Sequence, residues 1–151
     1  MNGAVIRGRI AEVAPDSEFE GVAFTQVVTV ELSSGQRLRL HDWMALGSPD
    51  HVGKDAELEV HVFEYGRLEL FPPGTNVSHG IRQDSHRPVG EVTGRIEGDE
   101  DGELRLDFGG GSLALIPRDE DRERLGSRVA GADCWARVTE ARFDLTRISR
   151  P

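Results

Sequence analysis

The sequence predicts an all-β fold made of two similar five-stranded barrels in tandem, each with a short helix between its third and fourth strands. Three observations lead to this prediction. Apolar and polar residues alternate in runs such as 28–32 and 37–40, which is the pattern of half-buried strands. Glycine-containing turns separate such runs, as at 33–36 and 109–111. The pattern of the first half of the chain then returns in the second half, which indicates an internal repeat.

The internal repeat is visible at three places. The segment Val5–Ile10 (VIRGRI) is echoed by Glu91–Ile96 (EVTGRI), and the hairpin over 28–40 is echoed by the hairpin over 104–115. The third echo is a set of inward positions, in which Ala56, Leu58 and Val60 match Cys134, Ala136 and Val138. Because identity between the copies is low, chance similarity between two β units is the alternative to duplication.

The repeat divides the chain into a first barrel over 1–72, a linker over 73–88 and a second barrel over 89–151. Each copy is expected to close with its own last strand, 68–71 in the first and 143–148 in the second. The linker is rich in proline, glycine and polar residues, so it could move freely or lie pinned across both barrels.

A short connector lies between the third and fourth strands of each copy. In the second copy, 117–126 begins with proline and acidic residues and ends with glycine, which are helix start and stop signals. In the first copy, 43–47 could form one helical turn. Three strands, a short helix and two more strands, repeated twice, resemble the order of the OB (oligonucleotide/oligosaccharide-binding) barrel. This resemblance implies an architecture and not a function, because OB folds host many functions.

Composition excludes several classes of function. The 151 residues carry a formal net charge of −9, which opposes non-specific binding to phosphate backbones and favours a basic partner. Cys134 is the only cysteine, so neither an internal disulfide nor a cysteine-based zinc site is expected. No signal-peptide pattern and no apolar run long enough for a membrane helix are present, so we expect a cytoplasmic protein without a membrane partner.

No residue cluster predicts catalysis or a cofactor. The serines at 33, 34 and 112 lie in turns without a nucleophile-elbow pattern, and the glycines at 109–111 lack the lysine and helix of a phosphate loop. Imidazole and carboxylate groups could form a weak metal site from His41, Asp42, Asp50 and His51. The second copy offers no such residues at comparable places, and nothing fixes a ligand geometry. We therefore expect a protein that is not an enzyme, with no metal and no cofactor.

A binding surface is the more productive hypothesis. Strand alternation turns large aromatics outward, with an acidic rim around them, and this is typical of a partner surface. The residues of this tentative protein-binding surface are His61, Phe63, Tyr65, Trp135 and Arg137. The alternative is that the two barrels pack on each other, or on the linker, at these aromatics.

The sequence therefore favours a non-enzymatic protein-binding module, for example an inhibitor, immunity-type or accessory protein. It would use its acidic surface and exposed aromatics to bind another protein. The second hypothesis is an OB-type protein that binds single-stranded nucleic acid through Arg37, Arg39 and Arg105. That face lacks stacking residues and the chain is acidic, so nucleic acid is the less favoured partner.

Overall fold

In the residues that it describes, the computed structural model has eleven β-strands, one short α-helix and one 3-10 turn. It describes residues 4–19, 22–83, 87–100, 102–126 and 134–151. The strands are β1 (Ile6–Phe19), β2 (Val22–Glu31), β3 (Arg37–Asp42), β4 (Asp55–Val62), β5 (Arg67–Phe71), β6 (Gly80–Arg82), β7 (Val89–Glu100), β8 (Glu103–Asp107), β9 (Ser112–Leu115), β10 (Trp135–Arg142) and β11 (Asp144–Ile148). The mostly β composition expected from the alternation is confirmed.

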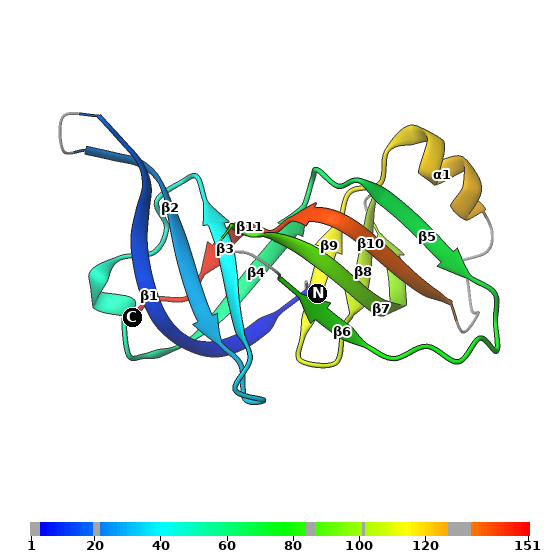
Figure 1. Ribbon diagram of the computed structural model, residues 1–151, viewed down its shortest axis with the longest axis horizontal. Helices are drawn as coiled ribbons and strands as arrows, with labels where there is room; N and C mark the ends of the chain where they lie inside the picture. Colours follow the sequence, from blue (N-terminus) through cyan, green and yellow to red (C-terminus); the bar gives the residue numbers. More distant parts are fainter. Residues whose placement is uncertain (1–3, 20–21, 84–86, 101, 127–133) are drawn as a thin grey trace.

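Five of these strands form a closed barrel, in the order β1, β2, β3, β11 and β4, with β4 pairing back to β1 (Figure 1). The seam between β3 and β11 is held by a single register pair, His41 with Asp144. Next to it, the side-chain amide of Gln83 fills the gap by bonding both backbone groups of Arg39. It accepts from the Arg39 N–H at 2.7 Å and donates to the Arg39 carbonyl at 2.8 Å.

The remaining strands continue the same sheet. β4 pairs in parallel with β9, and the order then runs through β8, β7 and β10 to β5. All eleven strands therefore belong to one sheet that is shared by both halves of the chain. Closure of the second half into a barrel of its own stays a prediction, because no backbone pairing joins β5 to β9 within the described parts of the chain.

The closing strands of the two halves are exchanged, which the repeat did not predict. β11, drawn in red, lies between β3 and β4 of the first barrel, and green β5 lies beside β10 (Figure 1). The expectation that 68–71 closes the first barrel and 143–148 closes the second is therefore wrong. The reason is geometric: only Phe143 separates β10 from β11, so one long run of extended chain crosses from one half into the other.

Residues 80–83 of the linker are pinned, and part of this segment is a strand. β6 pairs with β7, Ile81 is buried, and the side chain of Gln36 donates a hydrogen bond to the Ile81 carbonyl at 2.5 Å. Together with the Gln83 amide, these contacts tie 80–83 to both halves of the chain. Since buried backbone polar groups need partners, this segment is part of the packed structure.

The two connectors differ from each other. In the second half, α1 (Asp119–Leu125) lies between β9 and β10. In the first half, 43–44 form a turn and 45–48 have no regular structure, and the helical turn comes later, as η1 (Pro49–His51). The expected helical turn at 43–47 is absent because the Asp42 carboxylate accepts the Leu46 and Gly47 N–H groups, at 2.8 Å each.

The core follows the predicted alternation closely. Leu58, Val60 and Val62 of β4 are at most 1% exposed, and Ala136 and Val138 of β10 are fully buried. In the part of the chain that the structure describes, no helix is long and apolar enough to cross a bilayer.

Candidate binding surface

Phe63 lies just beyond the end of β4 and is 45% exposed. Its ring stacks on that of His61, with centroids 5.4 Å apart and planes 7° apart. His61 is in turn fixed by two hydrogen bonds, one between Nδ1 and Thr146 Oγ1 at 2.7 Å and one from Nε2 to Glu103 at 3.0 Å. An exposed aromatic ring is thus held in one orientation by residues from both halves of the chain.

Carboxylates flank this ring. Glu103 is 43% exposed and accepts from His61, and Glu64 follows Phe63 in the chain with a side chain that is 71% exposed. Glu64 pairs with Arg142 at 3.1 Å, so part of its charge is compensated. His61 and Phe63 thus lie together with two carboxylates nearby, and their role as a partner surface stays a prediction.

Tyr65 does not belong to this surface. It is only 8% exposed, because the strand ends at Val62 and the alternation no longer sets the direction of the following side chains. The Tyr65 hydroxyl donates to Asp121 and accepts from the Arg118 N–H, and the Arg118 guanidinium lies 4.4 Å from the centre of the tyrosine ring. Burial and the bond to Asp121 raise the pKa of Tyr65. Tyr65 anchors α1 to the chain segment before β5.

Asp121 is the centre of this anchor and is 4% exposed. Burial alone would raise its pKa, but hydrogen bonds from Tyr65 and Arg124, with the positive charges of Arg124 and Arg118, outweigh burial and lower the pKa. Arg124 donates to Asp121 at 2.6 Å and also to the Leu68 carbonyl of β5 at 2.6 Å. One buried carboxylate therefore links α1 to the exchanged strand.

We expect Asp121→Asn to destabilise the protein by about 2 kcal/mol at neutral pH, since hydrogen bonds to a charged group are lost. A carboxyl group whose folded-state pKa is lowered contributes stability above its unfolded pKa and loses it as pH falls through the folded value. The difference between wild type and variant should therefore shrink below about pH 4. Urea unfolding at pH 7, 5 and 3 measures this. A difference that stays constant over that range contradicts the assigned role of the charge.

Trp135 and Arg137 lie on β10, and each is in contact with a neighbour. The ring of His79 tilts onto Trp135 with centroids 4.6 Å apart. The Arg137 guanidinium lies 5.2 Å from the centre of the Phe71 ring and 3.3 Å from Glu91. His79 of the linker thus packs on Trp135, as the alternative hypothesis described. Of the five predicted residues, His61 and Phe63 stack on each other, Tyr65 is buried, and Trp135 is covered by His79.

The three arginines of the nucleic-acid hypothesis are also separated. Arg37 lies in β3 and pairs with Glu31 at 3.2 Å, and Arg39 follows it on the same strand with its backbone held by Gln83. Arg105 lies in β8, in the other half of the sheet. No stacking residue of this face was predicted, and the structure places none of the candidate aromatics beside these arginines in β3.

The weak metal hypothesis names His41, Asp42, Asp50 and His51, and three of them, His41, Asp42 and His51, are bonded to different partners. His41 bonds Asp144 at 2.8 Å, Asp42 is fully buried in its own loop, and His51 Nε2 lies 3.0 Å from the Ser149 carbonyl. Within the described ranges, no group of three or more His, Cys, Asp and Glu residues could hold a metal ion. These side chains instead stabilise loops and the barrel seam.

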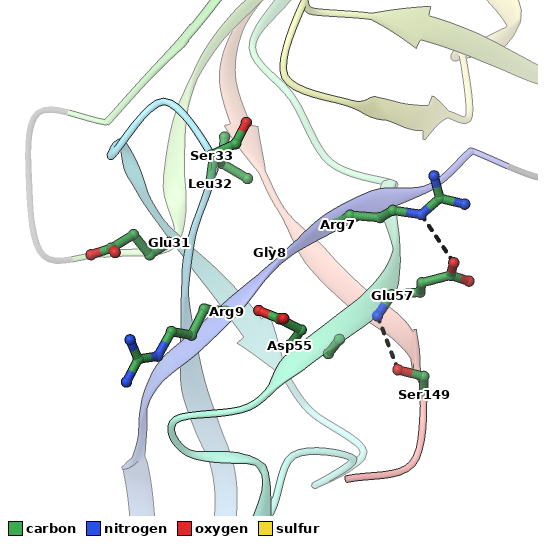
Figure 2. A pocket seen from close by; sticks show the side chains of 10 residues that line it. Arg7, Gly8, Arg9, Glu31, Leu32, Ser33, Asp55, Glu57 and Ser149 are labelled. Carbon is green, nitrogen blue, oxygen red and sulfur yellow. Dashed lines mark hydrogen bonds and ion pairs between the residues drawn. The ribbon is translucent and has the colours of Figure 1, made fainter.

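A groove of about 580 Å³ crosses the barrel where β1 passes from β4 to β2 (Figure 2). Its floor includes Gly8, and the charged groups around it have both signs. Arg7 pairs with Glu57 at 3.0 Å, while the carboxylate of Asp55 lies between Gly8 and Arg9 in the view of Figure 2. Because the two signs are interspersed, the groove shows no preference for an anion or a cation.

Sequence reasoning missed an exposed aromatic side chain. Trp43 is 50% exposed and Met44 is 40% exposed, directly after β3. Both lie in the segment 43–47, which was expected only as a possible helical turn. The available signal was Asp42. It occupies an inward position of the strand, in alternation with Leu38 and Leu40, and a charged residue at such a position indicates a structured loop rather than the start of a helix.

No protein-family model matches the chain, and no relative was found among curated protein sequences. Among solved structures, the fold is similar to that of the cytoplasmic molybdate-binding protein ModG, in a crystal form with molybdate bound. The sequences are 16% identical, the TM-score is 0.46, and the match covers 97% of this chain and 95% of that one. A likeness this distant carries no function to the present chain.

Proposed function

We propose that the chain is a non-enzymatic protein-binding module that contacts its partner through Phe63. The observation that supports this is a large apolar ring that is 45% exposed and yet held in place by its stack on His61. A rigid, exposed aromatic loses little side-chain entropy on binding, which is why such residues dominate interface energies. The aromatic part of the surface is reduced to His61 and Phe63, since Tyr65 is buried and Trp135 is covered.

The charge of the protein supports a basic partner. The formal net charge is −9, and the exposed carboxylates Glu64 and Glu103 lie near the ring. Complementary charge raises the rate of association and suppresses partners of like charge. An inhibitor, immunity-type or accessory protein that covers a basic surface would have these features.

The experiment is a pull-down from a lysate of the source organism with wild type, Phe63→Ala and Val52→Ala. Val52 is 46% exposed and lies next to η1, so it controls for loss of exposed apolar surface in general. We expect Phe63→Ala to lose a partner that Val52→Ala retains, with both variants folded by circular dichroism. Retention of every partner by Phe63→Ala contradicts the proposal.

Binding of single-stranded nucleic acid is the second candidate, and one measurement separates it from the first. Affinity for a labelled oligonucleotide that falls steeply with salt, and that falls further on replacement of Arg37 and Arg39, would favour nucleic acid. We expect no such binding, because Arg37 is already paired with Glu31 and the chain is acidic.

A further inference from the structure

The loop after β3 is built around one buried carboxylate. Asp42 is fully buried and accepts three hydrogen bonds, from the Leu46 N–H at 2.8 Å, the Gly47 N–H at 2.8 Å and the Gln26 side chain at 2.7 Å. Gln26 also donates to the Gly47 carbonyl at 2.6 Å. Since a buried carboxylate is stable only when its hydrogen bonds are satisfied, the loop has little freedom to change shape.

This loop contains backbone strain. Ala45 has a φ of 53°, a left-handed conformation that is unfavourable for a residue with a β-carbon. The loop is also packed tightly on the barrel, because a β-carbon on Gly47 would lie 2.7 Å from a methyl group of Val28. A strained turn persists where the surrounding structure enforces it, and such turns are often found at functional sites.

The side chains that this rigid loop presents are apolar. Trp43 is 50% exposed and Met44 is 40% exposed, although a turn at the surface would ordinarily carry polar residues. Tryptophan is among the residues that contribute most to binding, and methionine adapts its shape to a partner. An exposed apolar pair on a strained, preorganised loop therefore points to an interface.

The charge beside the loop indicates what kind of partner fits. Pro15 of β1 is paired with Gln26 of β2, which is paired with Asp42 of β3, the residue before the loop. Asp16, which follows Pro15 and is exposed, therefore lies at the same end of these strands as the loop. Glu12 and Asp16 of β1 are both exposed, and the formal net charge of the chain is −9. A partner that covers Trp43 would therefore also approach the carboxylate of Asp16.

We propose that Trp43 and Met44 form a second docking site, which binds a basic segment of a partner protein that also carries apolar residues. Apolar side chains of the segment would cover Met44 and the Trp43 ring. Its lysine or arginine groups would face Asp16 or lie over the indole. This inference rests on the proposed function, since it specifies the chemistry of the partner, but it uses a different surface from Phe63.

The experiment uses the full chain with Trp135→Phe, which leaves Trp43 as the single tryptophan. Two synthetic amphipathic peptides with the same leucine spacing are titrated, one with lysines and one with glutamates at the polar positions. We expect the lysine peptide to shift the Trp43 emission to the blue in a saturable way, about tenfold or more tighter than the glutamate peptide. Equal responses to both peptides, or no saturable response, overturn the proposal.

Calorimetry with variants locates the site. We expect Trp43→Ala to weaken binding of the lysine peptide about thirtyfold or more, and Asp16→Asn to weaken it and reduce its salt dependence. Val52→Ala and Phe63→Ala should leave it unchanged. If Phe63→Ala abolishes peptide binding and Trp43→Ala does not, the inference fails while the proposed function stands. A blue shift of the Trp43 emission on raising protein concentration alone, lost in Met44→Glu, overturns it in favour of a second copy of the chain.

Discussion

Replacement of Asp144 by alanine is expected to destabilise the protein by about 3 kcal/mol, because it leaves a partly buried arginine without its principal partner. Asp144 is fully buried at the first position of β11. Arg142 donates two hydrogen bonds to it, at 2.8 and 3.1 Å, and these bonds raise the pKa of the Arg142 guanidinium. We place the effect at the lower end of values for broken buried pairs, since 34% of the Arg142 side chain is exposed.

The position of Asp144 adds to this effect. In register it lies between His41 of β3 and His61 of β4, and His41 bonds its carboxylate at 2.8 Å. The carboxylate therefore joins the last residue of β10, the first of β11 and the weakly paired seam of the barrel. Its loss should loosen the strand that holds the two halves of the chain together.

Glu64→Gln is the matched control, since it removes a carboxylate from the same arginine. Glu64 pairs with Arg142 at 3.1 Å, but its side chain is 71% exposed, so the expected loss is below about 0.5 kcal/mol. Urea unfolding of wild type and both variants at pH 7 measures the difference. Similar, small losses in both variants would show that the buried bonds of Asp144 do not stabilise the protein.

Much of the fold could be predicted because alternation reports which face of a strand is buried. The inward positions Leu58 and Val60, and their counterparts Ala136 and Val138, are buried as expected. Alternation reports burial only within a strand. It therefore failed at Tyr65, three residues beyond the end of β4, where the side chain turns back to bond Asp121.

Strand partners could not be predicted in the same way. β5 and β11 both alternate between apolar and polar residues, and such a strand could pair with either half of the chain. The pattern therefore does not show whether each half closes with its own last strand or with that of the other half. The outcome depends in part on the connection between β10 and β11, which is the single residue Phe143 and leaves too little chain for β11 to fold back on β10. For the candidate site, the exposure of Phe63 could be predicted from the sequence. The contact of His79 with Trp135 could not, because it depends on where the linker lies.

The second large effect is expected from Gly94→Ala and Gly8→Ala, each of which should cost about 2–3 kcal/mol. A β-carbon on Gly94 would lie 2.5 Å from the Asp107 carbonyl oxygen, and one on Gly8 would lie 2.6 Å from that of Glu31. These obstacles are backbone atoms, so relief requires two strands to separate. The two glycines are matched positions in VIRGRI and EVTGRI. The arginine after each glycine occupies the same place in the sheet: Arg9 is paired with Glu31, and Arg95 is paired with Asp107.

Gly80→Ala distinguishes crowding from the general effect of replacing glycine in a strand. Gly80 lies in β6, and a β-carbon there would meet nothing within 4 Å. Alanine should therefore be tolerated, or should stabilise the protein by about 0.5 kcal/mol by restricting the unfolded chain. Thermal or urea unfolding of the three variants gives the comparison. If Gly94→Ala or Gly8→Ala is as stable as Gly80→Ala, the close approach of the strands does not constrain these positions, and the shared Gly-Arg-Ile segment needs another explanation than packing.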